Sequence, residues 1–400
     1  MITLASAVPP PVLLNAAQLA YAGSVAQSFF WDLVGRHWYV CQRNVTTGDE
    51  ERILVTRLTA EGDVVDSMHI SHAGHGANIG VERTAGSVFL WTDALPNGHW
   101  ASAVARVPYV PGGDVNASDT TLPASTITFH RPRPSGSVHR VSATIDPTRR
   151  ELIYRWQSND VSSDKAVGGI DRYALDTVVA GTYTPLATRP FPASGRSLQG
   201  YTSLGDHIYT LYGLPGEESR VTCTRWDTGE VVQDEPLTAF PSVVGREPEG
   251  LCVYEIAGAP PTLAFGVVSG ADGARRFNAG RFPRPETNPW VPLPYDTAVL
   301  APNGASYAPQ YRIAGDQVHL HFSLDRVDKG PWASGTKLFQ LPVPARPNRT
   351  QRLVGVVSGA FVTGQPLTVR LEVTADGWVT LFDDRGFKGW IGADVSFWTC

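Results

Sequence analysis

Five segments of this chain follow one plan, and this repetition constrains the fold more than any other feature of the sequence. Each segment has a small or polar residue, an apolar strand, a turn, a second strand with an aromatic residue, and a polar loop. The segments recur at intervals of roughly 45–65 residues and begin near Gln27, Gly74, Ser137, Leu198 and Glu247. Because a twisted four-stranded sheet cannot bury both faces alone, the repeats favour a five-bladed β-propeller over a β-sandwich.

Composition supports an all-β chain with more than one domain. The 400 residues exceed the size of one ordinary domain. The 39 glycines and 31 prolines suit many short strands joined by tight turns, and they are too few for a disordered chain. With only two methionines and no runs of strong helix formers, the sequence argues against a helical protein.

The repeats stop near residue 285, where a proline-rich stretch indicates a linker. Beyond it, alternation in residues 318–324 and the hairpin signal Asp376-Gly377 predict a second, smaller β domain. The expected fold is therefore all-β, a five-bladed β-propeller followed by a small β-sandwich-like domain. The expected divisions are an N-terminal arm or stem (1–23), the propeller (24–285), a linker (286–306) and a C-terminal head domain (307–400).

Charge and hydropathy argue against two classes of partner. The net charge of −5 provides no basic surface for nucleic acid or for an anionic membrane. No apolar stretch approaches the roughly eighteen residues that cross a bilayer. The apolar run near the N-terminus lacks a basic region and is interrupted by Pro9-Pro10-Pro11, so we expect no signal peptide.

The four cysteines are widely scattered, and none belongs to the closely spaced pair that is typical of zinc sites. Cys41, Cys223 and Cys252 each lie inside an apolar strand pattern. Buried thiols behave as small apolar side chains, so we expect these three to be buried and unpaired. Cys400 lies at the last position and receives no assignment.

Two motifs resemble a known family. Gly74-His75-Gly76-Ala77-Asn78-Ile79-Gly80-Val81-Glu82 followed by Phe89-Leu90-Trp91-Thr92 is similar to phage baseplate proteins often labelled teichoic acid biosynthesis protein C in actinobacterial genomes. Arg246-Glu247-Pro248-Glu249-Gly250-Leu251 followed by residues 264–276 is the second motif. The family includes staphylococcal phage receptor-binding proteins, and the resemblance covers roughly residues 24–285. It implies a homotrimer whose five-bladed propeller binds cell-wall teichoic acid.

The C-terminal part resembles a tail-fibre head domain through residues 335–342, Arg346-Pro347 and the closing Val395-Ser396-Phe397-Trp398. Such domains are usually trimeric, so the resemblance implies that residues 307–400 trimerise. The short N-terminal arm differs from the long stem of the staphylococcal proteins. A phage tail and a phage-like contractile injection system, secreted as a particle, therefore both stay open. The arm would attach the chain to other tail or baseplate proteins.

The candidate binding site follows from the propeller geometry. The first strand of each blade lines the central channel, so the strand starts gather at one mouth. The equivalent positions are Gln27, His75, His139, Gln199 and Glu249, with Asn78, Arg140 and Glu247 nearby. These side chains are candidates to bind sugar hydroxyls or, through His75, His139 and Glu249, a structural metal ion. Satisfying backbone groups and channel water is the alternative.

Three further sets of residues are candidates for binding. Trp100 lies in a polar loop and is a candidate for stacking on a sugar, while Arg275 and Arg276 suit a phosphodiester or a surface salt bridge. His319 and His321 share one strand face and could hold a metal ion on a trimer axis, although solvent-facing histidines are the commoner arrangement. No cofactor is expected beyond a possible structural metal ion.

These observations lead to a receptor-binding protein at the tip of a phage or phage-like tail that recognises a host glycopolymer. It would be made in the bacterial cytoplasm. The alternative is a propeller hydrolase that cleaves a cell-wall polysaccharide or phosphoester with Glu247, Glu249 and His75. The chain lacks the GxSxG and HExxH motifs and a phosphate-binding loop, so catalysis is the less favoured reading. A purely structural baseplate component is a third possibility.

Overall fold

The computed structural model describes residues 2, 4, 11–43, 52–98, 100–134, 138–158, 167–191, 195–256, 259–283, 287–314, 317–357, 368–383 and 386–399. The chain divides into two compact units. The first comprises Met1–Glu255 and Pro261–Phe282, and the second comprises Ile256–Pro260 and Pro283–Cys400. In the described residues, no helix has both the length and the apolar character needed to cross a membrane.

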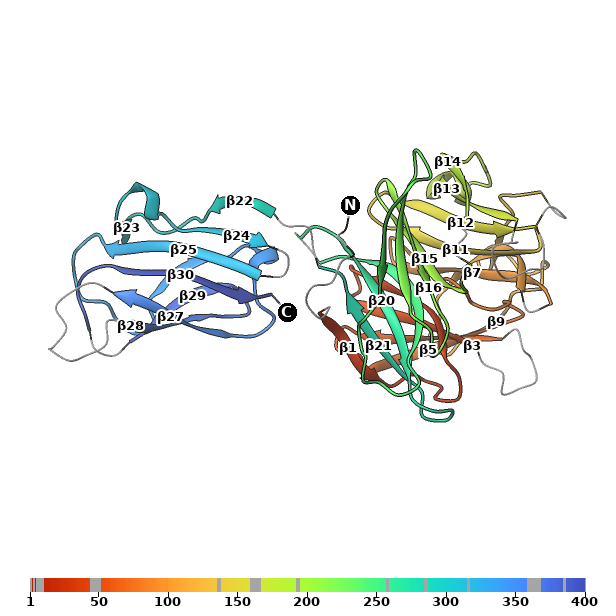
Figure 1. Cartoon of the computed structure of the whole chain (residues 1–400), viewed down its shortest axis with the longest axis horizontal. Helices are drawn as coiled ribbons and strands as arrows, with labels where there is room; N and C mark the ends of the chain where they lie inside the picture. The colour runs from red at the N-terminus through yellow and green to blue at the C-terminus, as the bar shows by residue number, and fades with distance from the viewer. Residues whose placement is uncertain are drawn as a thin grey trace. The chain divides into compact units, whose positions relative to one another are not determined.

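The first unit is a propeller built from five mainly antiparallel sheets (Figure 1). The first blade contains β2 (Ala26–Asp32), β3 (His37–Arg43), β4 (Ile53–Thr59) and β5 (Val64–Ser71), with β9 (Asp114–Asn116) parallel to β5. The second contains β6 (Gly80–Thr84), β7 (Ser87–Asn97), β8 (Trp100–Pro108) and β10 (Thr128–His130). The third contains β11 (Arg140–Asp146), β12 (Glu151–Gln157), β13 (Gly168–Ala174) and β14 (Ala187–Pro190), with the helix α1 (Leu175–Val179) after β13.

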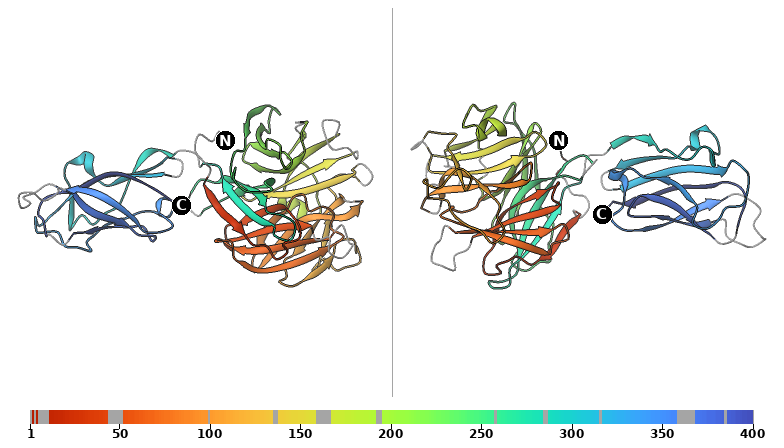
Figure 2. Two further views of the ribbon diagram at one scale, coloured as in Figure 1. Left: turned by 60° about the horizontal axis from the view of Figure 1, so that its bottom comes forward. Right: turned by 180° about the vertical axis from the view of Figure 1, so that it is seen from behind.

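The fourth blade contains β15 (Leu198–Leu204), β16 (His207–Tyr212), β17 (Arg220–Arg225) and β18 (Val231–Pro236). The fifth contains β19 (Glu247–Tyr254), β20 (Thr262–Ser269), β21 (Arg276–Arg281) and β1 (Val12–Ala17). The first strands β2, β6, β11, β15 and β19 contact one another in a closed ring, and Figure 2 shows these blades from two further sides. The predicted five-bladed propeller is confirmed.

The N-terminal segment takes part in closing the propeller. β1 pairs with β21, and Leu14 lies opposite Ala279. The backbone N–H of Ile2 donates to the Tyr209 hydroxyl at 3.0 Å, and that of Leu4 donates to the Gln233 side-chain oxygen at 2.9 Å. The described residues of the expected arm therefore pack on the propeller itself. They supply β1, the outermost strand of the fifth blade, beside β21.

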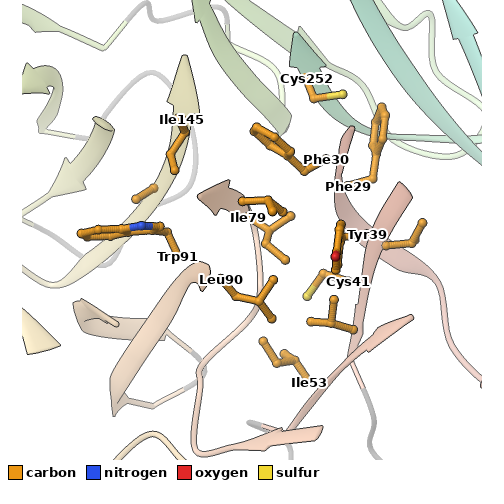
Figure 3. Close-up of a cluster of buried hydrophobic side chains, with 14 of the residues drawn as sticks. Phe29, Phe30, Tyr39, Cys41, Ile53, Ile79, Leu90, Trp91, Ile145 and Cys252 are labelled. Carbon is orange, nitrogen blue, oxygen red and sulfur yellow. The ribbon is translucent and has the colours of Figure 1, made fainter. Parts of the chain in front are cut away.

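Apolar side chains that alternate along the blade strands form the propeller core between neighbouring blades. Figure 3 shows Phe29, Tyr39 and Cys41 of the first blade facing Leu90 and Trp91 of the second, with Ile79 between them. All of these side chains are buried. Cys41, Cys223 and Cys252 are free and buried, as their strand patterns predict.

The second unit is a single curled sheet of nine hydrogen-bonded strands. Its strands run in the order β22 (Thr287–Pro292), β24 (Gln310–Ala314), β25 (Gln317–Arg326), β30 (Ile391–Trp398), β27 (Gln351–Val357), β28 (Thr368–Val373), β29 (Trp378–Phe382) and β26 (Lys337–Gln340), and β23 (Leu300–Pro302) pairs with β25. The short 3-10 helices η1 (Ala305–Tyr307) and η2 (Val343–Ala345) lie in its connections. β22 and β23 fall within the expected linker 286–306.

The core of this unit is almost entirely apolar. Val318, Leu320 and Phe322 alternate inward on β25, and they pack with Leu371 and Leu381 from β28 and β29. The Asp376-Gly377 signal connects β28 to β29 as a tight turn, in which the N–H of Gly377 donates to the Thr374 carbonyl at 2.8 Å. The predicted C-terminal β domain is confirmed, with the curled sheet as its form.

Candidate functional site

A cavity of about 250 Å³ lies at the end of the propeller where the first strands begin. Each of the five blades contributes a polar side chain from a strand start or from the loop before it. These side chains are Gln27, His75, Arg140, Gln199 and Glu249. Four of the five aligned strand-start positions, Gln27, His75, Gln199 and Glu249, line this cavity, and in the third blade Arg140 lines it in place of its neighbour His139.

Backbone conformation explains how the second blade contributes. The predicted strand over residues 74–82 begins only at Gly80, because Gly74 and Gly76 have φ of +86° and +69°. Such left-handed angles interrupt a strand and favour glycine. His75 therefore lies on a loop, and the buried Asp93 carboxylate accepts hydrogen bonds from the Gly76 N–H at 3.0 Å and the Ala77 N–H at 3.3 Å.

Arginine side chains dominate the charge of the cavity. Arg140 donates through Nε to the Gln157 Oε1 at 2.7 Å, and Arg155 donates through a terminal nitrogen to the same oxygen at 3.1 Å. The Nε of Arg155 is buried and has no hydrogen-bond partner among the described residues. Burial lowers the pKa of this guanidinium. Arg196 also lines the cavity and lies within 3.6 Å of Glu218.

Aromatic rings line the same space. The Arg140 guanidinium lies 4.4 Å from the centre of the Trp100 ring, and the His75 ring lies 4.9 Å from it. Trp156 and Phe191 line the cavity as well, and Arg155 stacks on Phe191 at 4.9 Å. Aromatic rings beside planar guanidinium groups can bind a sugar ring and an attached anionic group together.

Glu249 is the one carboxylic acid among the described residues that line the cavity. Its side chain is buried, and burial, together with the nearby Glu247, raises its pKa well above the ordinary value. Burial also raises the pKa of Asp93, which is outside the lining, to about 7, and the Gly76 and Ala77 N–H groups partly oppose that change. Both acids therefore favour the neutral form more than an exposed carboxyl does, so the arginines determine the charge of the cavity.

Other predicted residues lie outside the cavity lining. Asn78 is buried and donates to the Tyr201 carbonyl at 2.9 Å, which connects the His75 loop to the fourth blade. His139 lies against Asn97, whose amide nitrogen is 3.4 Å from the His139 Nδ1. Burial raises the pKa of the half-buried Glu247, and the charge of Arg275 opposes this.

Arg275 ends the β20–β21 turn and Arg276 begins β21, and neither lines the cavity. Arg275 pairs with Asp272 at 2.7 Å and donates to the Gly270 carbonyl at 2.8 Å. Arg276 donates to the Arg275 carbonyl at 3.2 Å. Of the two interpretations offered for these arginines, a salt bridge is the interaction that Arg275 makes.

The described parts of the chain contain no preformed metal site. No group of three or more His, Cys, Asp or Glu side chains lies together there in a way that could hold an ion. The structure thus does not gather His75, His139 and Glu249 as a ligand set. On β25, His319 lies 2.7 Å from the Ser396 hydroxyl, and His321 lies 3.8 Å from Asp394. Their meeting on a trimer axis stays a prediction.

Sequence reasoning missed the residues that come from second strands. Arg155, Trp156 and Gln157 end β12 and line the cavity. Tyr212, which ends β16, and Tyr201 of the first strand β15 also line the cavity and were not singled out. The direction of the strands could have identified them. The second strand of a blade runs antiparallel to the first, so its last residues lie at the mouth beside the first residues of the first strand, as Gln157 lies opposite Arg140.

Comparisons with known proteins agree with this architecture. A family model described as the phage five-bladed beta propeller receptor binding platform domain matches residues 25–279. The chain is 29% identical over 266 residues to a Bacillus subtilis (strain 168) protein named "Putative major teichoic acid biosynthesis protein C", covering 63% of this chain and 58% of that one. The tail fibre of Staphylococcus aureus phage P68 superimposes with a TM-score of 0.56 at 16% identity, over 93% of this chain and 96% of that one.

Proposed function

Because this chain belongs to the phage five-bladed propeller receptor-binding platform family, we propose that its channel-mouth cavity binds a phosphate-containing glycopolymer of the host surface. The description of the family supports a receptor-binding role, and the name of the Bacillus subtilis relative refers to teichoic acid. That relative is matched over only 58% of its length. The resemblance to a phage tail fibre supports a location in the virion tail.

One observation carries the proposal about the ligand. Arg155 presents a buried Nε without a partner among the described residues, and Arg140 lies on Trp100 beside it. A buried guanidinium with unused donors is costly unless an anion completes it. A polymer of sugars and phosphodiesters supplies both an anion for Arg155 and rings or polyols for Trp100 and Trp156.

Direct binding of defined oligomers tests this assignment. The full chain should bind a glycerol phosphate oligomer in calorimetry, and Arg155→Met should weaken that binding by roughly tenfold or more, since charge-assisted hydrogen bonds are strong. Arg225→Met is the matched control, because Arg225 is an exposed arginine of the same unit that pairs with Asp227. Equal affinities of the two variants would overturn the assignment of the cavity.

The oligomeric state belongs to the same proposal. We expect a homotrimer assembled through the second unit, because several apolar side chains on its neighbouring strands β27 and β30 are exposed: Val354 at 64%, Val356 at 48% and Trp398 at 47%. Single sugar sites bind weakly, so three cavities would raise the apparent affinity by avidity. Light scattering on purified protein measures the mass, and a monomer at micromolar concentration would refute this part. Attachment to tail or baseplate proteins through residues 1–23 stays a prediction.

A hydrolase is the second candidate, and the state of Glu249 favours it. A buried carboxyl with a raised pKa at a sugar-binding cavity is suited to act as a general acid. Glycosidases usually pair such an acid with a second carboxylate, and the described lining supplies only Glu249. Incubation with host cell walls separates the two functions, because a binding protein leaves the polymer intact and a hydrolase releases shortened fragments that Glu249→Gln would abolish.

A further inference from the structure

The second unit contains a groove at the seam where the two ends of its curled sheet meet. β22 lies at one end of the strand order and β26 at the other. Tyr295, just after β22, forms an isolated antiparallel bridge with Phe339 of β26. The groove beside this bridge has a volume of about 720 Å³, and its walls come from residues 291–296 and 337–342 together with Tyr311, Arg346 and Trp378.

Two cations line this groove without a carboxylate partner. Among the described residues, neither Lys337 nor Arg346 takes part in an ion pair. Asp296 is the one acid in the lining, and its Oδ1 accepts the Ala298 N–H at 2.9 Å. Asp376 lies outside the lining, and its carboxylate accepts the Thr374 hydroxyl; the charge of Lys337 adds a lesser lowering to the pKa of Asp376. The groove therefore has an excess of positive charge.

The cations are held in defined positions. Nε of Arg346 donates to the Leu341 carbonyl at 2.9 Å. A Cβ on Gly377 would come within 2.8 Å of this Nε, so a glycine at that turn makes room for the guanidinium. The Lys337 ammonium lies 4.6 Å from the centre of the Trp378 ring. Fixed donors lose less conformational entropy on binding, so both cations are prepared for an anion.

Aromatic side chains supply the remaining surface. Tyr295, Tyr311 and Trp378 are half-buried in the groove, and burial raises the pKa of the Tyr311 hydroxyl. Sugar rings present apolar faces that pack on such rings, while their hydroxyls need polar partners. An added peptide strand suits the seam less well, because Pro292 and Pro294 lack the N–H groups that strand pairing uses.

We propose that this groove is a second binding site, which takes an anionic saccharide with a carboxylate or phosphate group. The anion contacts Lys337 and Arg346, and the sugar ring packs on the aromatic side chains. This site lies wholly within the second unit, so it does not depend on the ligand assigned to the propeller cavity. It would let one chain hold its receptor at two places.

Titrations of the full chain with glucuronic acid, glucose 6-phosphate and glucose test the proposal. The indole N–H signal of Trp378, assigned with Trp378→Phe, should shift with one or both anionic sugars and much less with glucose. Lys337→Met retains the aliphatic stem over Trp378 and should weaken binding at least about fivefold, as should Arg346→Gln. The relative effects of glucuronic acid and glucose 6-phosphate identify the anionic group.

Two controls make the outcome decisive. Lys388→Met removes an exposed lysine of the same unit outside the groove and should leave the titration unchanged. Arg155→Met changes the propeller cavity and should also leave the Trp378 shift unchanged, even if the cavity assignment fails. If Arg346→Gln fails to fold, Lys337→Met decides alone. Equal binding of glucose, unchanged affinity in Lys337→Met, or no Trp378 shift would each overturn the proposal.

Discussion

The two units are both made of antiparallel strands, but their interiors differ in chemistry. The propeller buries many ionisable side chains, among them Asp93, Asp171, Glu82 and Arg281. In the described part of the second unit, the buried polar side chains are Ser323, Thr380 and Asp383. A closed ring of blades must fill its centre with strand edges and strand starts, whereas a curled sheet can bury one apolar face. The propeller stability should therefore depend on pairing and pH, and that of the second unit on apolar packing.

Removing a buried ion pair from the propeller should have the largest effect. Glu82 accepts hydrogen bonds from the Trp91 indole at 2.9 Å and from Arg106 at 2.7 Å, all within the second blade. Glu82→Ala removes the acceptor of the buried Trp91 indole and of the largely buried Arg106 guanidinium, and it should lower the free energy of unfolding by about 3–5 kcal/mol. Urea unfolding combined with hydrogen exchange in peptides of each unit measures this loss.

The matched change in the second unit is Glu372→Ala. Glu372 lies 3.3 Å from Arg352 and 3.5 Å from Arg370, and both arginine side chains are mostly exposed. Solvent screens such pairs, so the loss should stay below about 1 kcal/mol. Comparable losses from Glu82→Ala and Glu372→Ala would break the distinction between the two interiors.

The pH dependence of stability should be the second largest difference between the propeller and the second unit. Burial raises the pKa of Asp93 from 3.8 to about 7. The folded propeller thus holds this proton more tightly than the unfolded chain, and the stabilisation is lost as pH rises through 7. Between pH 5.5 and pH 8 this group alone should remove about 2 kcal/mol. Glu249 acts in the same direction.

Asp93→Asn isolates that contribution. The amide oxygen can still accept the Gly76 N–H, but the side chain no longer titrates. Unfolding of the propeller at pH 5.5 and pH 8 should therefore differ by about 2 kcal/mol less in Asp93→Asn than in the parent chain, while the second unit should change little in either protein. A full pH dependence in the variant would show that other groups control it.

Substitutions of turn glycines should give the smallest difference in stability between the two units. Here the second unit, not the propeller, should lose more. Gly377 in the second unit has φ of +92°, and an added Cβ would meet the Arg346 Nε and the Leu341 carbonyl at 2.8 Å. Gly86 in the propeller has φ of +86° and no atom within 4 Å of an added Cβ. Gly86→Ala should cost about 1 kcal/mol from backbone strain, and Gly377→Ala about 1 kcal/mol more from the clash. Equal melting shifts would contradict the contact with Arg346.

Local patterns in the sequence determined the elements and many of their faces. Period-two alternation and recurring turns predicted the five blades, the burial of Cys41, Cys223 and Cys252, and the Asp376-Gly377 turn, because each depends on residues close together in the chain. The aligned strand starts also predicted one channel mouth for Gln27 and Glu249, and both line the cavity there. These inferences need only the direction of each strand and the closure of a ring.

Tertiary structure alone decided which distant elements became neighbours. β1 pairs with β21 more than two hundred residues away, and Tyr295 meets Phe339 to form the seam of the second unit. Arg155 enters the cavity from a second strand whose pattern was that of a core strand. Such contacts depend on how sheets twist and close over long separations, and alternation within one strand carries no information about which strand will lie beside it.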